Sequence, residues 1–260
     1  MKKFVRKAFI GGNWKSNNTL ADSLAIAKWL NELRFNPANV EVVVAPPTLH
    51  IPAVSSALAN PNVHLAAQTL SAFGFGAYTG EISAKHLADF HVKWTLHGHS
   101  ERRSLFGEDD AAVAEKTRFA LEAGMSVVLC VGEQLEERRA ERTMAVVQRQ
   151  MQAVIARVTD AAAWDRVVVA YEPVWAIGTG QVATPEQAQA VHAQLRAWLA
   201  GQLGAEAAGR LRIVYGGSVT EKNCRALIEQ GDIDGFLVGG ASLKPAFGEI
   251  IAQVDAAFTP

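Results

Sequence analysis

The chain has 260 residues, 49% of them hydrophobic, and a formal net charge of -1. This balance excludes the basic surface of a nucleic-acid-binding protein and provides no attraction to an acidic membrane. Two cysteines without a Cys-x-x-Cys pair exclude a disulfide scaffold, and the apolar run after the basic start is too short for a signal peptide or a membrane span, so we expect a soluble cytoplasmic protein.

Short apolar runs predict eight strands, at residues 8–10, 41–44, 63–66, 93–96, 126–131, 167–170, 211–215 and 235–238. Stretches with helical spacing, such as Ala188, Val191, Leu195 and Trp198, lie between them. Most of the strands lack a polar face, which is typical of a parallel sheet covered on both sides. Eight β/α units without a linker predict one α/β domain over residues 1–260, a (β/α)8 TIM barrel. The alternative is a doubly wound open sheet, but no Gly-x-Gly-x-x-Gly motif opens the first helix.

The loops after the first and fourth strands carry polar residues, and catalytic groups gather at this end of such a barrel. Asn13 and Lys15 follow the first strand. A single lysine is most often a solvated surface charge, but at this rim Lys15 could neutralise an anionic substrate and a developing oxyanion. The fourth strand is followed by residues 97–103, His-Gly-His-Ser-Glu-Arg-Arg.

Two histidines in this segment have different interpretations. His99 lies at the predicted start of a short helix, where the positive helix end disfavours imidazolium, so we expect a neutral ring that donates a hydrogen bond to a carbonyl. His97 and His99 also have the spacing of a metal pair, although no third ligand accompanies them. Because alternate residues share one face of a strand, His97 is otherwise a polar neighbour of the site. Residues 133–142, after the fifth strand, predict a charged helix with a solvated face.

The loop after the sixth strand combines a carboxylate with a stiff entry and an adaptable exit. Glu172 ends the strand, Pro173 fixes the entry, and Gly178 and Gly180 loosen the exit. A helix start with a capping box follows at residues 184–187. This pattern predicts a catalytic base under a movable, water-excluding lid that raises its pKa. The alternative is a solvated glutamate on a surface loop.

Glycine-rich turns follow the last two strands, at residues 216–218 and 239–240. Backbone N–H groups in such turns can bind an anion, and a phosphate site after strands seven and eight recurs in this fold. The alternative is that the glycines only permit tight turns.

Five segments, taken together and in order along nearly the whole chain, resemble the triosephosphate isomerase family. They are residues 12–15, 98–103, 170–180, 215–218 and 237–243. The resemblance implies an isomerase that interconverts dihydroxyacetone phosphate and D-glyceraldehyde 3-phosphate through an enediolate, in glycolysis and gluconeogenesis. Proton transfer beside a carbonyl needs only a base and an electrophile, so we expect no metal and no organic cofactor.

The resemblance also implies a role for each matching residue. Glu172 corresponds to the general base, His99 to the neutral electrophile and Lys15 to the lysine that binds substrate and stabilises charge. Asn13 is the neighbour of Lys15 in the site, and Glu101 lies close to Lys15 and supports its charge. The groups that bind the substrate phosphate, which we call the phosphate grip, correspond to the backbone of Gly178, Ser218, Gly239 and Gly240.

Family members are usually homodimers, which implies that loop 68–81 enters the neighbouring subunit. Thr79 is then expected near the partner's site, with Phe73 and Phe75 as apolar anchors. Positions that depart from the common family pattern are Ser16, Thr69, His97, Gln181 and Val182.

Two rival functions explain less of the sequence. Another phosphate-binding barrel, such as an enzyme of tryptophan or histidine biosynthesis, explains the glycine turns but not Glu172 together with residues 98–103. A barrel kept as a binding or structural protein predicts the loss of Lys15, His99 or Glu172, and all three are present.

Overall fold

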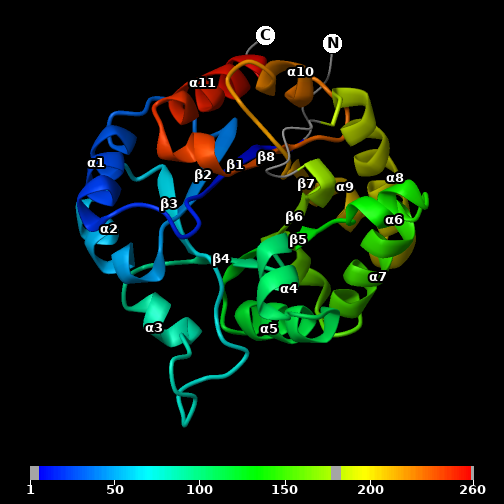
Figure 1. Ribbon diagram of the computed structural model, residues 1–260, viewed down its shortest axis with the longest axis horizontal. Helices are drawn as coiled ribbons and strands as arrows, with labels where there is room; N and C mark the ends of the chain where they lie inside the picture. Colours follow the sequence, from blue (N-terminus) through cyan, green and yellow to red (C-terminus); the bar gives the residue numbers. More distant parts are fainter. Residues whose placement is uncertain (1–5, 177–182, 259–260) are drawn as a thin grey trace.

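The computed structural model describes residues 6–176 and 183–258, and within them eight parallel strands close into a barrel in sequence order (Figure 1). The strands are β1 (Ala8–Asn13), β2 (Val40–Ala45), β3 (Val63–Ala67), β4 (Trp94–His97), β5 (Ser126–Val131), β6 (Val167–Tyr171), β7 (Arg212–Tyr215) and β8 (Gly235–Val238). The predicted (β/α)8 barrel and each of its strands are therefore confirmed. The largest difference between predicted and observed strand bounds is at β1, which continues past Ile10 to Asn13.

Helices surround the barrel and connect its strands (Figure 1). The α-helices are α1 (Leu20–Leu30), α2 (Ile51–Ala57), α3 (Ala84–Ala88), α4 (Ser100–Phe106), α5 (Asp110–Glu122), α6 (Leu135–Arg139), α7 (Thr143–Ile155), α8 (Pro185–Leu203), α9 (Ala205–Arg210), α10 (Cys224–Ile228) and α11 (Ala246–Phe258). The short 3-10 helices are η1 (Thr48–His50), η2 (Ala161–Arg166), η3 (Val174–Ala176) and η4 (Gly240–Leu243). Among the described helices, none combines the length and the apolarity that crossing a membrane requires.

Helix α8 begins where the sequence predicts. Thr184 is its N-cap and its hydroxyl accepts from the Gln187 N–H at 3.2 Å, while the Gln187 side chain accepts from the Thr184 N–H at 3.0 Å. This reciprocal pair satisfies two backbone donors that the first helical turn leaves free.

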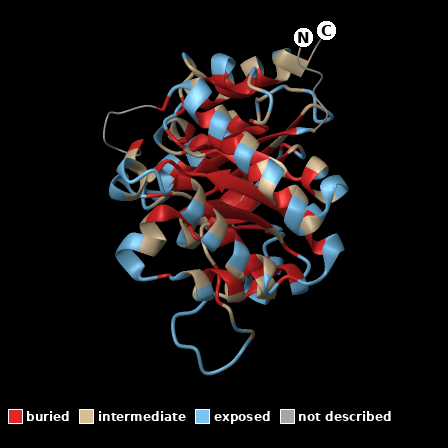
Figure 2. Ribbon diagram, turned by 90° about the vertical axis from the view of Figure 1, so that its right-hand side faces the viewer, coloured by how far each residue is buried: buried red, intermediate tan, exposed pale blue. Residues whose placement is uncertain are grey.

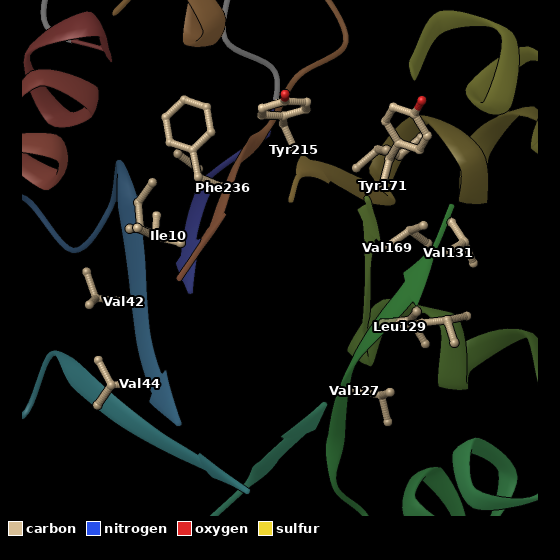
Figure 3. Close-up of a cluster of buried hydrophobic side chains, with 14 of the residues drawn as sticks. Ile10, Val42, Val44, Val127, Leu129, Val131, Val169, Tyr171, Tyr215 and Phe236 are labelled. Atoms are coloured by element: carbon tan, nitrogen blue, oxygen red, sulfur yellow. The ribbon is translucent and has the colours of Figure 1, made fainter. Parts of the chain in front are cut away.

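The core has two layers because alternate residues of each strand face opposite sides of the barrel wall. Phe9, Leu96 and Val168 belong to a buried cluster inside the barrel. Leu129 and Val169 belong to a second buried cluster that also contains helical side chains. Figure 3 shows these two residues on neighbouring strands. Figure 2 shows the buried strands enclosed by helices that are exposed on their outer faces. This packed frame holds the loops at the carboxyl ends of the strands in fixed relative positions.

Loop 68–81, between β3 and α3, projects from the barrel at the foot of Figures 1 and 2. Its aromatic side chains remain accessible, with Phe73 50%, Phe75 61% and Tyr78 43% exposed. The rings of Phe73 and Tyr78 stack with centroids 4.4 Å apart. The loop therefore presents apolar surface away from its own core.

Candidate active site

A pocket of 660 Å³ lies at the carboxyl ends of the strands. Asn13, Lys15, His99, Glu101 and Glu172 line it together, although they lie at or just after the ends of three different strands. The glycine turn at residues 216–218 and the turn at residues 239–240 line the same pocket. Because parallel strands end at one rim, the closed barrel brings these distant segments together.

The Glu172 carboxylate is almost completely buried, with the residue 2% exposed. Its backbone is fixed where β6 ends, because the Glu172 N–H donates to the Val131 carbonyl at 2.8 Å. One carboxylate oxygen accepts from the Ser100 N–H at 2.9 Å, and the other lies 3.0 Å from Nε2 of His99. A buried carboxylate with two short contacts is held in one defined orientation. The alternative of a solvated surface glutamate is therefore wrong.

His99 is the N-cap of α4, and both of its ring nitrogens have partners. Nδ1 accepts from the Glu101 N–H at 3.2 Å, so we assign the ring proton to Nε2, which donates to Glu172. The ring is therefore neutral in this arrangement. Burial lowers the pKa of His99, but the Glu172 carboxylate and its hydrogen bond raise it more, so that the net shift is upward.

The upward shift of the pKa is opposite in direction to the effect expected of the helix start, while the ring assigned here is still the neutral one. The helix start is present, but its effect on the ring is outweighed by a carboxylate 3.0 Å away, which no local pattern could place there. Forming an imidazolium would also break the bond from the Glu101 N–H, since Nδ1 would then carry a proton.

Lys15 is held in a left-handed backbone conformation, with φ at 53°. This conformation costs of order 1–3 kcal/mol for a residue other than glycine. Two contacts support it: the Lys15 N–H donates to the Asn13 side chain at 3.0 Å, and the Gln68 amide donates to the Lys15 carbonyl at 2.8 Å. The Lys15 ammonium lies 2.5 Å from a Glu101 carboxylate oxygen, as the resemblance implied. Sequence reasoning gave Gln68 no role in the site.

The glycine turns approach the site closely. A Cβ atom on Gly216 would lie 2.9 Å from Cγ of Glu172, so only glycine lets this turn pass the carboxylate without displacing it. A Cβ on Gly239 would contact the Lys15 side chain at 3.7 Å, whereas a Cβ on Gly240 would meet open space. Gly239 therefore lies beside the lysine, and Gly240, which also lines the pocket, has free space next to it.

Comparison with known proteins agrees with this geometry. The family model described as triosephosphate isomerase matches residues 8–254. The chain belongs to the triosephosphate isomerase family. It is 52% identical over 246 residues to the triosephosphate isomerase of Paracoccidioides lutzii, covering 95% of this chain and 98% of that relative. It is also 52% identical over 247 residues to the protein named triosephosphate isomerase, cytosolic, of Oryza sativa subsp. japonica, covering 95% of this chain and 96% of the relative.

Several positions that the sequence singled out lie away from this pocket or outside the described residues. Gly178, Gln181 and Val182 lie outside the described residues. Thr79 is exposed on loop 68–81 and is absent from the described lining of its own chain's pocket. Ser16 is exposed near the start of α1, and Thr69 accepts a hydrogen bond from Lys116 at 3.2 Å.

His97 is not among the described residues that line the pocket. It is fully buried on the outer side of β4, where Nδ1 lies 3.1 Å from the Thr117 hydroxyl of α5. Burial, with Lys116 nearby, lowers the pKa of His97 to about 3. Both interpretations, metal pair and site neighbour, are therefore wrong. Strand alternation ends before His99, because Gly98 has φ at 70° and turns the chain. Among the described residues, no cluster of three potential ligands could hold a metal ion.

The prediction that Glu133 lies on the solvated face of a charged helix is also wrong. Helix α6 covers only Leu135–Arg139, and Glu133 lies before it in a turn with no exposed surface. Its carboxylate accepts from the Tyr171 hydroxyl at 3.1 Å and from the Trp175 indole N–H at 3.0 Å, on either side of Glu172 in sequence. Burial raises the pKa of Glu133, against the opposing effect of these hydrogen bonds. This glutamate holds the segment that carries Glu172 and does not belong to a solvated face.

Proposed function

We propose that Glu172, His99 and Lys15 perform the reaction of this family, the interconversion of dihydroxyacetone phosphate and D-glyceraldehyde 3-phosphate in glycolysis and gluconeogenesis. The observation that carries the proposal is the 3.0 Å contact between Glu172 and Nε2 of His99, in a pocket that Lys15 also lines. The contact brings together a base, a proton donor and a cation within reach of one small molecule.

Glu172 removes a proton from the carbon next to the substrate carbonyl and later returns it to the neighbouring carbon. Both of its carboxylate oxygens are engaged, one by Ser100 and one by His99. The substrate must therefore replace Glu172 as the acceptor for one of these two donors. His99 is the donor whose proton is mobile. When the Nε2–H of His99 turns to the carbonyl oxygen, the freed carboxylate oxygen can accept the carbon-bound proton.

His99 and Lys15 stabilise the enediolate in different ways. The Nε2–H of His99 donates to the oxygen on which charge develops, and the neutral ring can pass that proton between the two oxygens. The Lys15 ammonium contributes charge, and its backbone supports keep it at the rim before substrate arrives. Neither step calls for a metal or an organic cofactor.

The substrate phosphate is assigned to the backbone of Ser218, Gly239 and Gly240, with Gly178 as a further member outside the described residues. The two turns line the same pocket as Lys15 and Lys244, so backbone N–H donors and two lysines are available, and no arginine is among the described lining residues.

The substitution Gly240→Val tests this phosphate grip. The added side chain extends into open space that the phosphate needs, so the Ki of inorganic phosphate should rise about tenfold or more, the equivalent of one lost bond to a charged group. Gly201→Val in α8, where a Cβ also meets open space, is the matched control and should leave Ki unchanged. A crystal soaked with phosphate should show it beside Ser218 and Gly240; binding elsewhere on the barrel would refute the grip.

We further propose a homodimer formed through loop 68–81. Phe73, Phe75 and Tyr78 are exposed, and burying each of them could contribute roughly 1.5–3 kcal/mol. Thr79 in the same loop would then support the partner's Asn13 and His99. The dimer makes activity depend on association, although each barrel carries its own catalytic groups.

Deleting residues 74–77 tests the dimer. The deletion removes Phe75 and shortens the loop that carries Phe73 and Tyr78, so that these side chains no longer reach a partner. The variant should therefore sediment as a monomer, with kcat lowered at least about tenfold because loops around the site lose their support. Circular dichroism should confirm an intact barrel. Wild-type protein that is fully active as a monomer at micromolar concentration would end the proposal.

The proposal also covers the extent of the catalytic domain and the cellular location of the enzyme. We treat residues 1–260 as one catalytic domain, and we place the enzyme in the cytoplasm, as the name of the Oryza sativa relative suggests. A coupled assay with purified protein and D-glyceraldehyde 3-phosphate tests the activity itself. Turnover that rises with added enzyme is expected, and a complete lack of it would remove the basis of the catalytic roles.

A further inference from the structure

The backbone of Glu172 is in close contact with the turn that follows β5. A Cβ atom on Gly132 would lie 1.7 Å from the Glu172 carbonyl oxygen, so the two main chains touch with no space for a side chain. The neighbouring Val131 carbonyl accepts the Glu172 N–H at 2.8 Å. The position of the Glu172 backbone therefore depends on where this turn lies.

One side chain holds the turn from the outside. Gln150 of α7 is 5% exposed, and its amide makes two hydrogen bonds to Gly132. Its oxygen accepts from the Gly132 N–H at 2.8 Å, and its nitrogen donates to the Gly132 carbonyl at 3.1 Å. A primary amide that binds both polar groups of one residue fixes that residue in position and in orientation.

The support behind Gln150 is rigid, whereas the turn itself has little packing on that side. Val147, Met151 and Val154 anchor α7 in the core and are fully buried. By contrast, a second cavity of 280 Å³ is lined by Gly132, Gln150 and Glu172. A cavity next to the turn leaves room for the turn to shift. The two hydrogen bonds from the Gln150 side chain, and not side-chain packing, therefore keep the turn in place.

We propose that Gln150 is a positioning residue that sets the location of Glu172 through Gly132. The proposal rests on the assignment of Glu172 as the base. Gln150 is absent from the described lining of the substrate pocket, and the phosphate turns follow other strands. Its loss should therefore change kcat and leave substrate affinity nearly unaltered, since a small displacement of a catalytic group affects the chemical step.

The first test is Gln150→Met, which keeps the length of the side chain and removes both hydrogen bonds. We expect kcat to fall about 10- to 100-fold, with KM and the Ki of inorganic phosphate within about twofold of wild type. Gln152→Met, at an exposed position of the same helix, is the control and should retain wild-type kcat. If Gln150→Met fails to fold, Gln150→Glu replaces it, because it keeps the acceptor for the Gly132 N–H and should give a smaller fall in kcat.

The second test separates positioning from general loosening. In a Glu172→Asp background the base is already displaced, so adding Gln150→Met should lower kcat by less than about threefold. An equal fold loss in both backgrounds, a parallel rise in the Ki of phosphate, or an unchanged kcat in the single variant would overturn the inference. If Glu172→Asp alone kept wild-type kcat, the assignment of the base would fail instead, and the two failures are thus distinguishable.

Discussion

Replacing Glu172 with glutamine should lower kcat at least about 10³-fold, because the amide cannot accept the carbon-bound proton. The substitution preserves the shape of the side chain, and the amide oxygen can still accept from the Ser100 N–H. The fold and the Ki of inorganic phosphate should therefore remain close to those of the wild type. The measurement is a coupled assay in both reaction directions, accompanied by thermal unfolding.

Glu221→Gln is the matched control for this experiment. Glu221 lines the same pocket, so its substitution removes the same charge from the site without touching the proposed base. A comparable loss in both variants would mean that pocket charge and not proton transfer explains the effect. Near-normal turnover of purified Glu172→Gln would end the assignment of the base.

Replacing Lys15 with alanine should impair both binding and turnover. The ammonium meets the anionic substrate and the developing enediolate, so KM should rise while kcat falls about 10²- to 10³-fold, as for other preorganised donors. The loss also leaves the Glu101 carboxylate without its cation in the pocket that the anionic substrate enters. Steady-state kinetics at several ionic strengths measures both parameters.

Lys244→Met provides the matched control, since Lys244 lines the pocket but takes no part in the proposed chemistry. A weaker effect there would show that position matters beyond the number of positive charges. If Lys15→Ala left both KM and kcat unchanged, Lys15 would be an ordinary solvated lysine.

The order of the barrel and the rim that carries the site were predictable because they depend on local patterns. Apolar runs mark the strands, and polar residues at the ends of those strands mark the rim, so Glu172, His99 and Lys15 could be assigned before their distances were known. The capping box at Thr184 is equally local, since both partners lie within one helical turn.

The predictions that were wrong concern residues whose environment depends on contacts between distant segments. His97 has the spacing of a site residue, but the turn at Gly98 separates its environment from that of His99. Glu133 fits a helical charge pattern, yet it lies in a turn under Tyr171 and Trp175. Glu133 lies two residues after the buried strand β5, close to the position that marked Glu172 after β6, and this similarity could have identified it. No comparable signal marks Gln150, because a glutamine within a helix is usually solvated.

Isotope exchange tests the central claim most directly. With dihydroxyacetone phosphate in deuterium oxide, wild-type enzyme should place deuterium on the carbon next to the carbonyl, because the Glu172 carboxylate exchanges its proton with solvent. Nuclear magnetic resonance of the recovered substrate and product detects the label. We predict incorporation by the wild type and its loss in Glu172→Gln. Undiminished incorporation by the variant would contradict proton transfer by Glu172.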